Sequence, residues 1–317
     1  MNTFVDRFIT LRPTHRTLYT SALLLAGTIV LFAAGIWLDP RYLGGAPVWL
    51  KPTKFALSLA MYSASMLWIL SLLRRRDRLV RFAGFWIVAV SALELGIIAL
   101  QASRGVLSHY NTSTPLDGAL YSSMGIAIGS LWLLHLIITV LVMRQKLENP
   151  VLSLSLRLGL VLTLIGMAEA FLMTSPTATQ MATLQSGGLS SIIGAHSVGV
   201  ADGGVGLPVV GWSTRGGDLR IGHFMGIHAL QLLPLLGWLL AGSGRLLERQ
   251  KTQLVWVASL GFLGTMALTT VQALRGQSIV APDSLTVTLG GGLLVLVVGA
   301  AAWILRGARA RLNRTAG

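Results

Sequence analysis

Eight apolar runs, each long enough to cross the hydrocarbon core of a bilayer, constrain this sequence of 317 residues more than any other feature. A helix needs about 20 mostly apolar residues to cross that core. Only 11% of the residues are charged, against about 25% in soluble domains, so the chain cannot cover itself with a solvated surface. We therefore predict an all-α integral membrane protein with eight transmembrane helices. The expected spans are roughly 17–38, 53–73, 80–102, 119–143, 152–173, 219–241, 252–274 and 285–306.

The basic residues predict the orientation of these spans. Of the 25 Lys and Arg residues, 18 lie in the N-terminal segment, the even-numbered connections and the tail, and seven lie on the other side. The more basic side of a membrane protein is normally cytoplasmic. We expect a multi-pass protein of a bacterial-type plasma (inner) membrane with both termini in the cytoplasm. The net charge of +14 is spread between apolar runs, which indicates orientation signals rather than a nucleic-acid partner.

Similar short segments recur in the same order in the two halves of the chain. GAPV at 45–48 and GLPV at 206–209 precede the second and sixth spans, and QASRG at 101–105 and QALRG at 272–276 end the third and seventh. Lys54-Phe55 and His223-Phe224 open the second and sixth spans. Because each half has four spans, we expect two parallel four-helix repeats related by a pseudo-twofold axis along the membrane normal.

This organisation predicts four segments. They are a cytoplasmic N-terminal segment (1–16), a first four-helix repeat (17–147), a second repeat (148–306) and a basic cytoplasmic tail (307–317). The second repeat contains a long extracytoplasmic loop, 174–218, rich in Gly, Ser and Thr, and loops of this length often cover or form binding sites. Gly125 and Gly129, four residues apart, are expected to let helices approach closely.

Ionisable residues inside apolar spans are costly, so each is a candidate for function. Most of them fall in the extracytoplasmic half of the predicted spans or at its boundary. The chain has no cysteine, which excludes thiol catalysis, disulfides and cysteine-ligated metals. His135 lies deeper, toward the cytoplasm. The candidates of the outer half are Glu94, Glu169, His223, His228, Gln101, Arg104, His109, Gln272 and Arg275.

These residue types suggest distinct roles. Imidazoles are common ligands of transition metals and haem, so we assign His109, His223 and His228 as metal ligands. Carboxylates can ligate metal or carry protons, and we assign that catalytic role to Glu94 and Glu169. Each could instead be a structural hydrogen-bonding group between helices.

The two QAxRG segments have two readings. The arginines and glutamines could form a cofactor-binding clamp for a propionate or another anion. They could equally close helix C-termini, where a cation offsets the helix dipole and glycine ends the helix. The sequence leaves both open for Gln101, Arg104, Gln272 and Arg275.

The leading functional hypothesis is a membrane redox protein, an oxidoreductase in that case, that binds haem b or a transition metal (copper, iron or manganese) in the outer half of the bundle. Its partners would be the lipid bilayer and a quinone or another electron-transfer partner. The two four-helix bundles, with histidines toward the extracytoplasmic side, resemble the haem A synthase family in architecture. That family's signature segments find no match here, so no family is assigned. The alternative is a proton- or ion-coupled transporter of a small, anionic solute, and a third reading is an assembly or lipid-interacting subunit.

Overall fold

The computed structural model describes residues 16–73 and 76–315, and in that part of the chain it contains nine helices and four two-residue strands. The predicted N-terminal segment 1–16 lies outside the described residues except for Arg16. The same is true of Arg74 and Arg75, which contribute to the charge asymmetry, and of residues 316–317 of the tail.

Eight helices are long and apolar enough to cross a membrane, which confirms the predicted number of spans. Their bounds agree with the predicted spans to within four residues, except that α10 continues nine residues beyond the predicted end of the eighth span. Helix α5 starts four residues earlier than predicted. There Thr114 accepts a hydrogen bond from the Asp117 amide and Pro115 opens the helix, a favoured arrangement for a helix start. The eight are α2 (Arg16–Leu38), α3 (Leu50–Ser71), α4 (Asp77–Arg104), α5 (Pro115–Arg144), α6 (Pro150–Thr174), α8 (Arg220–Ala241), α9 (Glu248–Leu274) and α10 (Ser284–Thr315).

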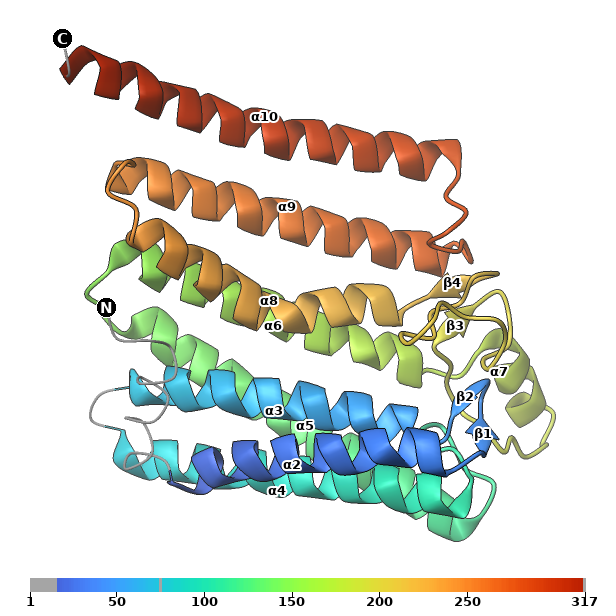
Figure 1. Ribbon diagram of the computed structural model, residues 1–317. Coiled ribbons are helices and arrows are strands. Elements are labelled where there is room, and N and C mark those ends of the chain that lie inside the picture. The colour runs from blue at the N-terminus through green and yellow to red at the C-terminus, as the bar shows by residue number, and fades with distance from the viewer. Residues whose placement is uncertain (1–15, 74–75, 316–317) are drawn as a thin grey trace. The chain divides into compact units, whose positions relative to one another are not determined.

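Two of the connections between these helices carry the remaining elements (Figure 1). A hairpin of β1 (Tyr42–Leu43) and β2 (Ala46–Pro47) joins α2 to α3 through Gly44 and Gly45, whose φ angles of 57° and 79° suit a tight two-residue turn. The loop between α6 and α8 contains α7 (Ala178–Gln185), β3 (Ser197–Val198) and β4 (Gly217–Asp218). The predicted long loop is therefore partly structured.

The chain divides into two compact units. Unit 1 comprises residues 1–141, 174–195 and 202–211, and unit 2 comprises residues 142–173, 196–201 and 212–317. The loop between α6 and α8 thus contributes segments to both units. We refer to the end of each unit where the short strands lie as its hairpin end.

Unit 1 is built on α2, which packs along α3 and α4. Leu25, Ala56 and Leu95 form part of a buried cluster between these three helices. At the hairpin end Asp39 accepts hydrogen bonds from Arg41 and from the indole of Trp49, and these two groups hold the pKa of Asp39 well below its usual range. Trp49 in turn packs against Gly35, where a Cβ would lie 2.8 Å from its ring. The hairpin is thereby fixed to α2.

Unit 2 depends on glycines that bring α6 and α8 together. A Cβ on Gly226 would lie 2.3 Å from the Gly166 Cα, and one on Gly237 would lie 1.9 Å from the Ser155 hydroxyl oxygen. Close approach of helices through small residues is common in membranes. The prediction placed such an approach at Gly125 and Gly129 instead, and it was wrong: within the described residues no atom beyond their own helix lies within 4 Å of the Cβ position of either.

Replacing Gly226 with Ala should lower the thermal stability of the purified protein. Alanine normally favours a helix over glycine by about 1 kcal/mol, but here its methyl group would overlap the α6 backbone, and overpacking costs about 1–3 kcal/mol. Gly129→Ala is the matched control, since its methyl group meets open space. Thermal unfolding in detergent, followed by circular dichroism, measures the difference. Equal stability of the two variants would contradict the close crossing.

Candidate functional site

Three helices of unit 2 bring polar groups together near its hairpin end. Glu169 in α6 accepts a hydrogen bond at Oε1 from the Thr270 hydroxyl in α9, at 2.9 Å. Gly222 in α8 leaves room for both groups, because a Cβ there would lie 2.1 Å from the Thr270 oxygen and 2.5 Å from Glu169 Oε2. Oε2 is buried and has no hydrogen-bond partner among the described residues. One oxygen of the Glu169 carboxylate therefore has a hydrogen-bond partner and the other has none.

His223 follows Gly222, the α8 residue that contacts the Glu169 carboxylate, and a hydrogen bond fixes the orientation of its ring. Its Nδ1 is 2.7 Å from the Gly166 carbonyl oxygen, and a carbonyl can only accept. Nδ1 therefore carries the proton, which leaves Nε2 with a lone pair when the ring is neutral. The hydrogen bond crosses from α8 to α6 beside the Gly166–Gly226 contact, so the helix crossing also positions the imidazole.

The other two histidines of unit 2 lie near His223. Both His196 and His228 are within electrostatic reach of its ring. The His196 carbonyl accepts a hydrogen bond from the Leu219 amide at 3.0 Å, and the His228 ring stacks on Phe224 with centroids 6.4 Å apart. In the part of the chain that the structure describes, no three His, Asp or Glu side chains are grouped so that they could hold a metal ion.

Glu94 is the buried carboxylate of unit 1. It is 1% exposed in α4, and its Oε1 has no hydrogen-bond partner among the residues described. The Lys51 ammonium at the start of α3 is within electrostatic reach of this carboxylate and also lies 5.8 Å from the centroid of the Phe55 ring. Unit 1 therefore also holds an incompletely paired carboxylate, here with a cation nearby.

His109 belongs to unit 1, whereas His223 and His228 belong to unit 2. It lies in the connection between α4 and α5 among aromatic rings, with the centroid of Phe55 at 5.5 Å and that of Tyr121 at 6.5 Å. Its Nδ1 is 3.2 Å from the Ser108 hydroxyl. The deeper His135 is fully buried in α5, where its Nδ1 is 3.3 Å from the Tyr62 hydroxyl in α3.

The two QAxRG segments adopt the same local geometry. Gly105 and Gly276 have φ angles of 71° and 70°, in the left-handed region that closes many helices. The Val106 amide donates to the Gln101 carbonyl and the Gln277 amide to the Gln272 carbonyl, at 3.0 and 3.1 Å. These backbone contacts support the helix-closing interpretation of both segments.

Each arginine of the segments pairs with an aspartate at the start of the following helix. Arg104 and Gln101 both donate to Asp117 at 2.7 Å. Arg275 pairs with Asp283 and holds the pKa of Asp283 well below its usual range, helped by the Thr286 amide. The positive charges are thus balanced by carboxylates, and the anion clamp gains no support from this geometry.

Several residues of the site were not among the sequence candidates. No sequence pattern singles out Thr270, Gly166 or Gly222, because small and hydroxyl residues are common in membrane helices. Asp117 and Asp283 did have one: each follows a QAxRG segment and lies at the start of the next span. Extending the repeat by one helix start would have found both.

Comparison with known proteins gives no further assignment. No protein-family model, curated protein or solved structure matches this chain. The function must therefore be argued from the site itself.

Proposed function

We propose that the chain is a proton-coupled membrane carrier of a small solute, with Glu169 as its proton-binding group. The half-satisfied carboxylate of Glu169 at the meeting of α6, α8 and α9 carries this proposal. An ionised carboxylate with an unpaired oxygen away from water is costly, and binding a proton removes the charge. A group whose charge state changes between packed helices is what couples a proton to helix movement in a carrier.

The packing of Glu169 against α8 links its charge state to the position of that helix. Oε2 lies against the backbone of Gly222, with no side chain between them. Proton loss would place a full negative charge against α8 and favour entry of water or a cation between the helices. Glu94 in unit 1 would act in the same manner, with Lys51 as its counter-charge. The sequence suggested an anionic solute because of Arg104 and Arg275, but both arginines pair with aspartates and so give no support for an anion.

Glu169→Gln should remove the pH-dependent step while leaving the fold intact, because the amide keeps the shape of the side chain and can still accept from Thr270. Infrared difference spectra between acidic and alkaline buffer, recorded on the full chain in vesicles, should lose a carboxylic C=O band. Solute-induced currents across supported membranes, screened with a panel of small metabolites, should lose their dependence on the pH gradient.

Glu248→Gln is the control, because Glu248 is an exposed carboxylate at the start of α9. It should change neither the C=O band of the buried carboxyl group nor the currents. Spectra of Glu169→Gln identical to those of the unaltered protein would show that Glu169 does not exchange a proton, and the carrier proposal would fail.

A redox role remains the second candidate, because one observation favours it. Histidines that ligate metal or haem normally donate their second ring nitrogen to a carbonyl or carboxylate, as His223 does to Gly166. A single imidazole with a free Nε2 lone pair suffices as one axial ligand of haem. Glu94 and Glu169 would then carry protons, and a quinone or another electron-transfer partner would accept electrons.

This candidate predicts a coloured or metal-containing protein. With haem precursor and metals supplied during expression, the purified chain should show a Soret band or stoichiometric iron, copper or manganese. His223→Ala should lose it, whereas His135→Ala, at a histidine of unit 1 whose ring contacts Tyr62, should keep it. A colourless, metal-free preparation of the unaltered chain would exclude the redox role.

We also propose that the chain is an internal duplication lying in a bacterial-type inner membrane with both termini in the cytoplasm. The shared geometry of the two QAxRG segments and their aspartate partners supports the duplication. The basic residues support the orientation. Two parallel repeats would be related by a pseudo-twofold axis along the membrane normal.

Single cysteines test this orientation, because the chain has none of its own. Ser186→Cys, in the loop between α6 and α8, should react with a membrane-impermeant thiol reagent applied to intact cells. Gly244→Cys, between α8 and α9, should react only after the cells are opened. The reverse pattern would place the termini outside.

A further inference from the structure

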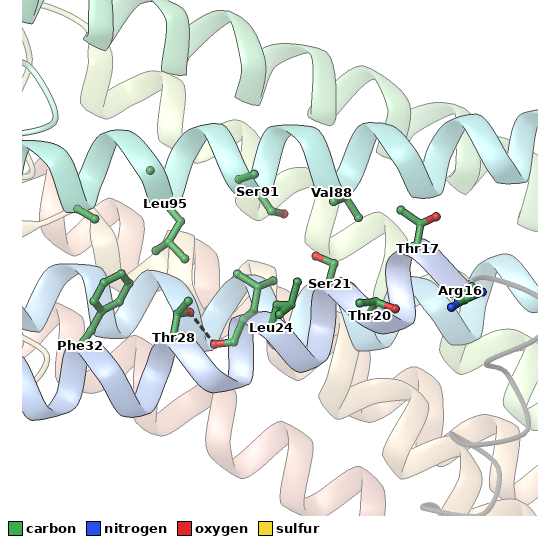
Figure 2. Close-up of a pocket in the computed structure, with 14 residues that line it drawn as sticks. Arg16, Thr17, Thr20, Ser21, Leu24, Thr28, Phe32, Val88, Ser91 and Leu95 are labelled. Atoms are coloured by element: carbon green, nitrogen blue, oxygen red, sulfur yellow. Dashed lines mark hydrogen bonds between the residues drawn. The ribbon is translucent and has the colours of Figure 1, made fainter.

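A groove between α2 and α4 in unit 1 is lined by none of the candidate site residues described above (Figure 2). Its volume is about 630 Å³. It extends from Arg16 at the start of α2 to Phe32, a distance of about 24 Å at 1.5 Å per residue. Most of its length is apolar, lined by Leu24, Leu25 and Leu95.

The polar groups of the groove are concentrated at the Arg16 end. Thr17 and Thr20 lie beside Arg16 in the first described turns of α2, so a cationic group and two hydroxyl groups are close together there. Among the described residues that line the groove, none carries a carboxylate that could balance the guanidinium.

Ser91 in α4 is a further polar residue of the groove. Its side chain is 1% exposed, and its hydroxyl has no hydrogen-bond partner among the described residues. Figure 2 shows this hydroxyl directed from α4 toward α2, facing Ser21 across the groove. A buried hydroxyl without a partner costs free energy, so a ligand group that accepts or donates there would offset that cost.

We propose that this groove binds one glycerophospholipid with an anionic headgroup. The phosphate would lie at Arg16, Thr17 and Thr20, an ester oxygen of the lipid would accept from Ser91, and an acyl chain would follow the apolar part to Phe32. This order of polar, ester and hydrocarbon groups matches the order of residues along the groove. The length suffices for an acyl chain, which covers about half of the 30 Å hydrocarbon core, plus its headgroup. The inference does not depend on the proposed carrier function.

Gly96 allows the groove to be filled without disturbing the fold. It lines the groove, and a Cβ there would meet open space. Gly96→Leu should therefore block the acyl chain. Gly27→Leu is the matched control: it makes the same exchange in α2, also into open space, at a residue that does not line the groove.

Native mass spectrometry of the full chain in detergent, titrated with phosphatidylglycerol or phosphatidylcholine, measures the binding. The unaltered protein and Gly27→Leu should retain one phosphatidylglycerol in preference to phosphatidylcholine, and Gly96→Leu should retain neither. Arg16→Gln should weaken phosphatidylglycerol binding by about tenfold, the loss expected for one charge-assisted contact. Ser91→Ala should weaken both lipids by a smaller, equal factor.

Two results would overturn the inference. One is equal retention of phosphatidylglycerol by Gly96→Leu and Gly27→Leu, which would place the lipid elsewhere. The other is equal retention of the two lipids by the unaltered protein, which would remove the role of Arg16. Arg16→Gln leaves the apolar part unchanged, so it gives an answer even if Gly96→Leu does not fold.

Discussion

The crossing of α6 and α8 at Gly166 and Gly226 determines the geometry of unit 2. With no side chain at either position, the two backbones approach until a Cβ could not fit between them. This approach brings the Gly166 carbonyl within hydrogen-bond distance of His223. One turn away it brings Glu169 against Gly222, where Thr270 of α9 can reach the carboxylate. In a membrane, where apolar side chains gain little by leaving lipid, packing of this kind replaces the hydrophobic effect as the main source of helix association.

Unit 1 is organised differently. Its α2, α3 and α4 pack through leucine, alanine and aromatic side chains. Some of its polar residues are joined in pairs, such as Tyr62 with His135 and Trp86 with Ser130. The two units share one device, an arginine at the end of a helix that pairs with an aspartate at the start of the next. This pair links the end of one helix to the start of the next and balances the charge of the arginine.

The number and extent of the spans could be predicted from the sequence because a bilayer imposes a simple length and polarity requirement on every helix. The candidates Glu94 and Glu169 could be identified because a carboxylate in an apolar span is conspicuous. The partners could not: which helix lies beside Glu169 depends on Gly222 and Gly226, and glycine in a membrane helix is common. The same reasoning explains the error at Gly125 and Gly129, whose spacing is typical of a helix contact but which meet none. Two glycines four residues apart place small residues on one face of a helix. Whether another helix packs against that face depends on the arrangement of the neighbouring helices.

The division of the loop between α6 and α8 has a consequence for how the protein is made. Unit 1 includes residues 174–195, and within it the Thr112 amide donates to the Ser191 carbonyl while the Ile193 amide donates to the Tyr110 carbonyl. When α5 has left the ribosome, residues 110–112 still lack these partners. They become available only after α6 has been synthesised and inserted. The connection between α4 and α5 therefore completes its backbone hydrogen bonds only after elongation through the fifth span.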